Sequence, residues 1–259
     1  MIGRTCRSFV FAGVLALVPA SAGAGAGPPP VALTAAPARV LLVGSARTTV
    51  RVRNSGTKRV AVDVSRAGFA LGLRGRPRIV WSGGARSAAG WLTLQPAHLT
   101  IGPRSTVSLA VAAKLPRGAE PGDHDALVLL ATRPVASGRV GVRLRLGLVV
   151  VVRAPGPIVR RLGMSAPRVA RRRPATMLEL MVANHGNVTE SLRGVRAVLS
   201  KDHHQVAAAS AASRDLRPRT RGILTFRYRR PLHGRMMVNV VIPADGGRKR
   251  LQRTYRIRL

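Results

Sequence analysis

Apolar and polar residues alternate along most of this chain with a period of two. Valines alternate with arginines over residues 50–53, and similar alternation runs through residues 60–64 and 106–111. A period of two places successive side chains on opposite faces of a β-strand, so each segment predicts a strand with one buried face and one wet face. Residues 126–131 are apolar on both faces and predict a central strand.

Turn-forming residues separate the predicted strands at spacings of roughly 8–15 residues, which is typical of a β-sandwich. Two prolines flank a glycine at residues 155–157, and this break predicts a linker. Alternation then resumes. The sequence therefore predicts an all-β fold of two tandem immunoglobulin-like β-sandwiches, residues 31–154 and residues 158–259. The alanine-rich run over residues 207–213 is interpreted as a short helix or a loop.

The two predicted units share a strand that closes in an Asn-x-Gly sequence. The first has Asn54-Ser55-Gly56 and the second has Asn184-His185-Gly186. Asn and Gly both tolerate a positive φ, so each sequence predicts a turn. Two interpretations remain open: the two sandwiches are related, or two hairpins use the same turn residues independently.

The first 26 residues have the pattern of a secretory signal peptide. Two arginines precede a run of ten apolar residues (9–18), and small residues follow. Ten apolar residues are too few to span a bilayer, which takes about 20. The single cysteine, Cys6, lies before the apolar run, so the mature chain is expected to have neither disulfides nor thiolate metal ligands. We expect a cleaved signal peptide and an exported protein, extracellular or associated with the cell envelope, without a transmembrane span.

Four segments resemble bacterial immunoglobulin-like envelope proteins: VRVRNSGTKRVAVDV (50–64), WLTLQP (91–96), TIGPRSTVSLAVAAKLP (100–116) and AEPGDHDALVLLATR (119–133). They are similar to the N-terminal domain of the WxL-interacting surface proteins. This resemblance implies peptidoglycan binding by the first unit and host-protein binding by the second. That family ends in a membrane span and a basic tail, and this sequence shows neither.

A second, weaker resemblance is to periplasmic pilus chaperones, which also have two sandwiches in tandem. The strand pattern near Ala38-Arg39-Val40 is similar to the opening of their first domain. The stretch after Lys114-Leu115-Pro116 departs from them, because it lacks an acidic-Ser-aromatic pattern. The resemblance implies a protein that lends a strand to secreted subunits.

Candidate catalytic chemistry is sparse. The chain has nine acidic residues, and the one close set is Glu120, Asp123 and Asp125 around His124. We weigh two interpretations of this set, a solvated turn with local hydrogen bonds and a metal or acid–base site. The neighbouring His203 and His204 would point to opposite faces of a strand and could not easily share one ion. A nucleophile elbow and a phosphate-binding glycine loop are both missing, so we expect no enzyme activity, no cofactor and no metal.

Positive charge is the strongest chemical signal, with 44 basic residues against nine acidic ones and a formal net charge of +35. Forty of the basic residues are arginine, whose planar fork binds phosphate or carboxylate with two hydrogen bonds. The candidate anion-binding residues are those of the arginine clusters: Arg171, Arg172, Arg173, Arg227, Arg229 and Arg230. An excess of arginine is also typical of proteins encoded by GC-rich genomes. On this interpretation the arginines form a solvated surface without a binding role.

Nucleic acid would suit the same charge, but export and the scarcity of aromatic residues for base stacking argue against it. Two interpretations remain open for each of Trp81 and Trp91. Each is either a residue that packs in the core or against a hairpin, or a platform on which a ligand stacks. The function predicted from the sequence is an exported, non-enzymatic cell-envelope binding or adhesion protein. Its expected partners are an anionic cell-wall polymer or peptidoglycan, another surface or secreted protein, or both. The alternative is a periplasmic-type chaperone for secreted or pilus subunits.

Overall fold

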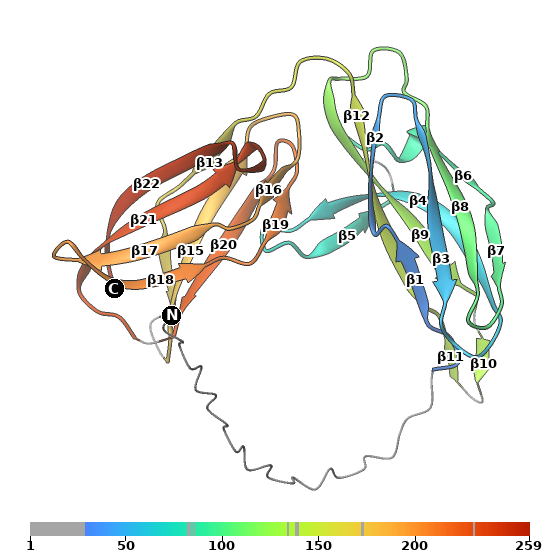
Figure 1. Cartoon of the computed structure of the whole chain (residues 1–259), viewed down its shortest axis with the longest axis horizontal. Coiled ribbons are helices and arrows are strands. Elements are labelled where there is room, and N and C mark those ends of the chain that lie inside the picture. Colours follow the sequence, from blue (N-terminus) through green and yellow to red (C-terminus); the bar gives the residue numbers. More distant parts are fainter. Residues whose placement is uncertain are drawn as a thin grey trace, which may run out of the picture.

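The structure is a computed structural model of the 259-residue chain, and it describes residues 29–81, 84, 86–133, 135–137, 140–171, 174–229 and 231–259. The predicted signal peptide lies outside the described residues. Throughout the described chain the regular elements are strands and two short 3₁₀ helices (Figure 1). They form two β-sandwiches in succession, so the predicted all-β, immunoglobulin-like class is confirmed. No helix in the described part is long and apolar enough to cross a membrane.

The first sandwich contains the 3₁₀ helix η1 (Ala89–Trp91) and twelve strands: β1 (Leu33–Ala36), β2 (Arg39–Val43), β3 (Arg47–Asn54), β4 (Val60–Leu71), β5 (Pro77–Val80), β6 (Leu92–Gln95), β7 (His98–Ile101), β8 (Thr106–Ala113), β9 (Gly122–Thr132), β10 (Val135–Ser137), β11 (Val140–Val142) and β12 (Arg145–Ala154). One sheet has the order β1-β3-β8-β6. The facing sheet has the order β2-β12-β9-β4-β5, and β7 also pairs with β4. A small hairpin, β10-β11, follows β9.

The alternation of the sequence explains how these strands pack. In β3, Val50 and Val52 are completely buried in the core of the sandwich, and Arg51 between them is exposed. β9 lies between β12 and β4, and each of its residues is buried. This confirms the central strand that the sequence predicted. The chain changes sheets after β1, because β1 pairs antiparallel with β3 whereas β2 pairs parallel with β12.

The second sandwich contains η2 (Asp245–Gly247) and ten strands: β13 (Leu162–Met164), β14 (Arg168–Arg171), β15 (Thr176–Asn184), β16 (Glu190–Leu192), β17 (Arg196–Lys201), β18 (His204–Ser210), β19 (Arg214–Leu216), β20 (Arg221–Tyr228), β21 (Arg235–Ala244) and β22 (Lys249–Arg258). One sheet is formed by β13 and β14 on one side of β15 and by β20 on the other, and the other sheet has the order β18-β17-β21-β22. β16 pairs with β19. The core of this sandwich, centred on Phe226, Leu180 and Val240, is a separate cluster from that of the first.

The alanine-rich run was interpreted wrongly. Most of it, up to Ser210, belongs to β18, which pairs with β17. Ala207 and Ala209 pack against the core while Ala208 faces outward. Alanine has a high helix propensity, but this tertiary packing outweighs it. The small side chains carry too little hydrophobic contrast for the period of two to be visible in the sequence.

The two Asn-x-Gly sequences form the same hydrogen-bonded turn in the two sandwiches. Asn54 is buried, its Nδ2 donates to the Lys58 carbonyl at 2.7 Å, and its Oδ1 accepts from the Gly56 amide at 3.0 Å. In the second sandwich Asn184 makes the same bonds to Val188 and Gly186, at 2.8 and 2.9 Å.

The glycines of the Asn-x-Gly turns are needed for a reason that the sequence pattern does not show. Neither has a positive φ. A Cβ on Gly56 would lie 2.5 Å from the Pro30 carbonyl oxygen, and one on Gly186 would lie 2.3 Å from the Val159 carbonyl oxygen. In each sandwich a preceding segment crosses directly over the glycine, so close approach of two backbones selects the residue. The shared geometry supports the interpretation that the two sandwiches are related.

Candidate functional site

β2 forms an edge of its sheet and carries apolar side chains on both faces. Val40 and Leu42 point into the core, whereas Leu41 and Val43 are 51% and 62% exposed. β12 pairs with one side of β2 through a parallel register. Within the part of the chain that the structure describes, no strand pairs with the other side. An unpaired edge with exposed apolar side chains is a template on which another protein can add a strand.

Apolar side chains also lie on the outward face of the same sheet, beyond β2, but they are buried or half-buried. The strand register places Leu41 next to Val151, and Val149 next to Leu127. A small cluster separate from the sandwich core lies further along this face, and it comprises Ala67, Leu127 and Leu129 with Phe69, Ile79 and Val149 packed against them. The large apolar side chains that remain exposed here are therefore those of β2 itself, Leu41 and Val43.

Ion pairs tie the two sandwiches together. Four of them connect a residue of the first sandwich with one of the second: Arg39–Asp215, Arg74–Glu179, Arg217–Asp125 and Arg219–Glu120. The β4-β5 hairpin also reaches the second sandwich (Figure 1), where the Leu73 carbonyl accepts from the Ile223 amide and from the Arg214 guanidinium, both at 2.7 Å. The two sandwiches therefore share a polar, tightly bonded interface.

Most of the acidic residues serve in such pairs. Eight of the nine acidic side chains, all of which the structure describes, have a basic partner: Asp63, Glu120, Asp123, Asp125, Glu179, Glu190, Asp215 and Asp245. Asp202 is the one that takes part in none of these pairs. The acids thus hold the fold together and leave most arginines without a counter-charge.

The two aspartates of β9 show this role most clearly. Asp123 is 1% exposed and accepts from Arg153 at 2.6 and 3.1 Å and from the Thr189 amide of the second sandwich at 2.8 Å. Asp125 is 2% exposed and pairs with Arg217, whose guanidinium also stacks over the Phe69 ring at 4.4 Å. Burial raises the pKa of Asp125 above its usual value, and Arg217 offsets part of that effect.

These positions correct both interpretations of the acidic set. The aspartates are buried rather than solvated. They also do not converge with a histidine, because His124 points to the opposite face of β9, where its Nε2 donates to the Glu120 carbonyl at 2.8 Å and its ring lies 4.4 Å from that of Trp91. The Glu120 side chain pairs with Arg86 and Arg219. Among the described residues, no group of three histidine or acidic side chains is close enough to hold a metal ion.

A hollow of about 450 Å³ lies between the two sandwiches, next to these ion pairs. Its lining includes Phe69 and Val80 from the first sandwich and Arg217 and Thr220 from the second. Arginines and apolar side chains therefore meet at the cleft.

The structure brings only part of the predicted anion-binding set together. Arg171 and Arg227 lie in one row on either side of Met177, on three neighbouring strands, and Arg229 follows β20 at an exposed position. Arg172, Arg173 and Arg230 lie outside the described residues. Glu179 lies in the next row of the same sheet, between Arg168 and Thr225.

The two tryptophans lie in different environments. Trp91 is half-buried, packs against the core of the first sandwich and contacts the ring of His124. Trp81 is 67% exposed, directly after β5. The packing interpretation therefore suits Trp91, whereas Trp81 is free to contact a partner.

Comparison with known proteins gives likeness of fold alone. No protein-family profile matches the chain, and no curated protein matches it either. Similar solved structures include the YadV chaperone (10% identity, TM-score 0.51, 87% of this chain and 99% of that chain) and the class 5 fimbriae chaperone CfaA (13% identity, TM-score 0.51, 88% and 100%). A chain from a chaperone–tip adhesin complex of CFA/I fimbriae biogenesis is similar as well (13% identity, TM-score 0.51, 86% and 98%).

These are the proteins of the second resemblance found in the sequence. The resemblance to the WxL-interacting surface proteins is not shown by any of them, nor is peptidoglycan binding. Sequence reasoning also missed Leu41 and Val43. Their signal is a run of four apolar residues, 40–43, which predicts a strand covered on both faces; only the pairing of strands shows that one of those faces is open.

Proposed function

We propose that this protein is an exported, non-enzymatic binding protein that acts as a periplasmic-type chaperone. It would hold a secreted or pilus-type subunit by strand addition at the β2 edge. The observation that carries the proposal is this edge, where Leu41 and Val43 are more than half exposed and no described strand pairs with the free side of β2. An unpaired β-strand of the subunit would gain backbone hydrogen bonds from β2 and would cover the apolar side chains.

Two further features support this function over binding to a wall polymer. The similar solved structures include chaperones and a chaperone–adhesin complex. The arginines, in contrast, are spread over both sandwiches, and Arg39, Arg217 and Arg219 are held in ion pairs between the two sandwiches.

A site-specific photo-cross-link tests the proposal in the native host. A benzophenone amino acid replaces Val43 in one variant and Arg51, on the exposed face of the opposite sheet, in a control variant. We expect the Val43 position alone to cross-link to an exported β-subunit. In the reconstituted complex, amide hydrogen exchange of β2 should slow, and the Val43→Asp variant should fail to keep the subunit soluble.

Equal cross-linking from both positions would contradict the proposal, as would a subunit that stays soluble without this protein. Because Val43 is exposed, its replacement by Asp should leave the melting temperature within a few degrees of the native value. A loss of subunit binding by this variant would therefore reflect the edge and not unfolding.

A further inference from the structure

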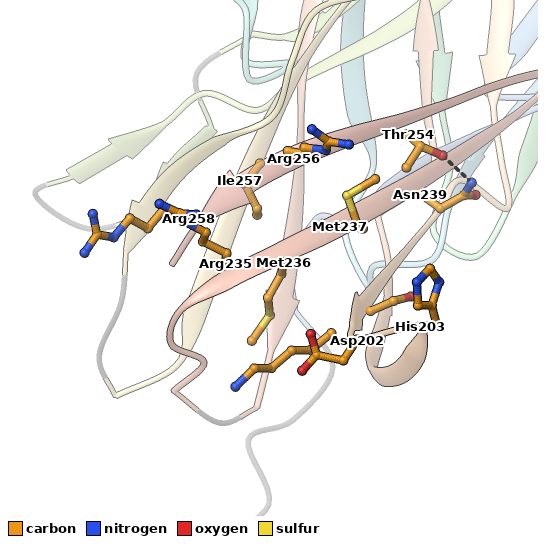
Figure 2. A pocket seen from close by; sticks show the side chains of 12 residues that line it. Asp202, His203, Arg235, Met236, Met237, Asn239, Thr254, Arg256, Ile257 and Arg258 are labelled. Atoms are coloured by element: carbon orange, nitrogen blue, oxygen red, sulfur yellow. Dashed lines mark hydrogen bonds between the residues drawn. The ribbon is translucent and has the colours of Figure 1, made fainter.

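The outward face of the β18-β17-β21-β22 sheet has a hollow that is separate from the β2 edge and from the cleft between the sandwiches. The hollow is open to solvent and measures about 960 Å³. Strands β17, β21 and β22 supply most of its lining, and the turn between β17 and β18 supplies Asp202 and His203 (Figure 2). This volume is enough for a ligand of several linked groups.

Three arginines from two neighbouring strands line this hollow. Arg235 of β21 and Arg258 of β22 are direct cross-strand partners, and Arg256 lies two residues before Arg258 on the same face. Cβ atoms of cross-strand partners are about 5 Å apart, and side chains two residues apart on a strand are separated by about 7 Å. Figure 2 shows Arg235 and Arg258 side by side.

These arginines carry like charges, and the one acidic side chain among the described residues that line the hollow, Asp202, forms no ion pair with any of them. All three are exposed, and none takes part in an ion pair among the described residues. Like charges placed directly opposite each other destabilise a sheet. Such a local conflict is expected where a sequence serves binding rather than stability, because a bound anion would relieve it.

The floor of the hollow adds neutral hydrogen-bonding groups and some apolar surface. Asn239 and Thr254 are cross-strand partners joined by a hydrogen bond of 2.9 Å, and Ser200 lies on the next row. Met237 lies between Ser200 and Arg256 and is 39% exposed. Several arginines together with hydroxyl and amide groups are the chemistry that recognises phosphate.

We propose that this hollow binds a chain-like phosphate anion, whose phosphate groups are held by Arg235, Arg256 and Arg258. Charge density favours a phosphate chain over an acidic peptide, since every phosphate group of such a chain carries at least one charge, whereas an extended peptide presents at most one carboxylate per two residues on one face. The concave shape favours a chain over a bilayer, because a flat bilayer surface cannot enter a hollow between strands. The site is independent of the proposed chaperone function.

Calorimetric titration of the purified protein with inorganic tripolyphosphate tests the proposal. The double variant R235Q/R258Q removes the cross-strand pair. The control R51Q/R53Q also removes two neighbouring arginines, which lie two residues apart on the exposed face of β3 and do not line this hollow. We expect R235Q/R258Q to weaken tripolyphosphate binding at least tenfold and R51Q/R53Q to weaken it less than twofold.

Equal weakening in the two pairs would overturn the proposal, because binding would then follow total charge. Phosphatidylglycerol vesicles and polyglutamate are the competing occupants. The proposal would also be overturned if Arg235 and Arg258 are needed for vesicle flotation or for polyglutamate binding but not for tripolyphosphate binding. Melting curves without ligand check the fold: relief of the repulsion should leave the melting temperature of R235Q/R258Q equal to the native value or raise it.

Discussion

The repeated Asn-x-Gly turn leads to a quantitative prediction about the free energy of unfolding. Replacing Asn184 by alanine removes three hydrogen bonds to backbone groups: Nδ2 to the carbonyls of Val188 and Leu216, at 2.8 and 3.0 Å, and Oδ1 to the amide of Gly186, at 2.9 Å. The side chain is 1% exposed, so these groups would be left buried and unpaired. A buried group without a partner costs about 1–3 kcal/mol, and partial relaxation leaves an expected loss of roughly 3–5 kcal/mol.

The first sandwich should respond in the same way to Asn54→Ala. Its Nδ2 donates to the Lys58 and Gly102 carbonyls, and its Oδ1 accepts from the Gly56 amide. The matched control is Asn239→Ala. That side chain is half-exposed and bonds only to the Thr254 hydroxyl among the described groups, so we expect a loss below about 1 kcal/mol.

The aromatic residues make it possible to follow each sandwich separately during urea unfolding. Both tryptophans, Trp81 and Trp91, belong to the first sandwich, and both tyrosines, Tyr228 and Tyr255, to the second. Asn54→Ala should lower the urea midpoint seen by tryptophan fluorescence by about 1–3 M, and Asn184→Ala should do the same for the tyrosine signal. The reasoning is refuted if either alanine variant costs no more than the Asn239 control.

Three further predictions concern single contacts. Gly186→Ala should cost roughly 1–3 kcal/mol in urea unfolding, because its Cβ would lie 2.3 Å from the Val159 carbonyl oxygen; the opposite result would show that the crossing segment shifts easily. Tyr228→Phe should cost about 1 kcal/mol, since it removes the 3.2 Å hydrogen bond to the Ala197 carbonyl, and a neutral result in thermal melting would argue against that bond. Asp125 has a folded pKa raised above 3.8, so the folded state binds its proton more tightly and stability falls as the pH rises from 3.8 through the folded pKa. Native protein should therefore lose stability relative to Asp125→Asn over that range in urea titrations, and a relative gain would contradict the raised pKa.

The fold was largely predictable because it depends on local alternation. A period of two is visible wherever valine and arginine alternate, as in β3, and β9 is recognisable because it is apolar on both faces. β18 was missed because a run of alanine and serine carries little contrast between its two faces. The repeated Asn-x-Gly sequence was visible, but the need for glycine comes from segments outside each turn that cross over Gly56 and Gly186.

The candidate site was much less predictable, because it depends on pairings between distant residues. Asp125 meets Arg217 across 92 positions, and no spacing rule indicates which of forty arginines it selects. The exposure of Val43 is equally hidden, since a buried central strand and an unpaired edge strand can share the same apolar run. The arginine clusters were visible, but the opposition of Arg235 and Arg258 follows from the β21-β22 register alone.

The use of nearly all acidic side chains in ion pairs has a consequence for the colloidal behaviour of the protein. Its exterior is that of a polycation, because carboxylates that could neutralise it are occupied within the fold. Two copies should repel each other strongly at low ionic strength and stay monodisperse. Salt shortens the range of this repulsion to about 8 Å at physiological strength, and multivalent anions such as citrate should bridge neighbouring molecules and bring them out of solution.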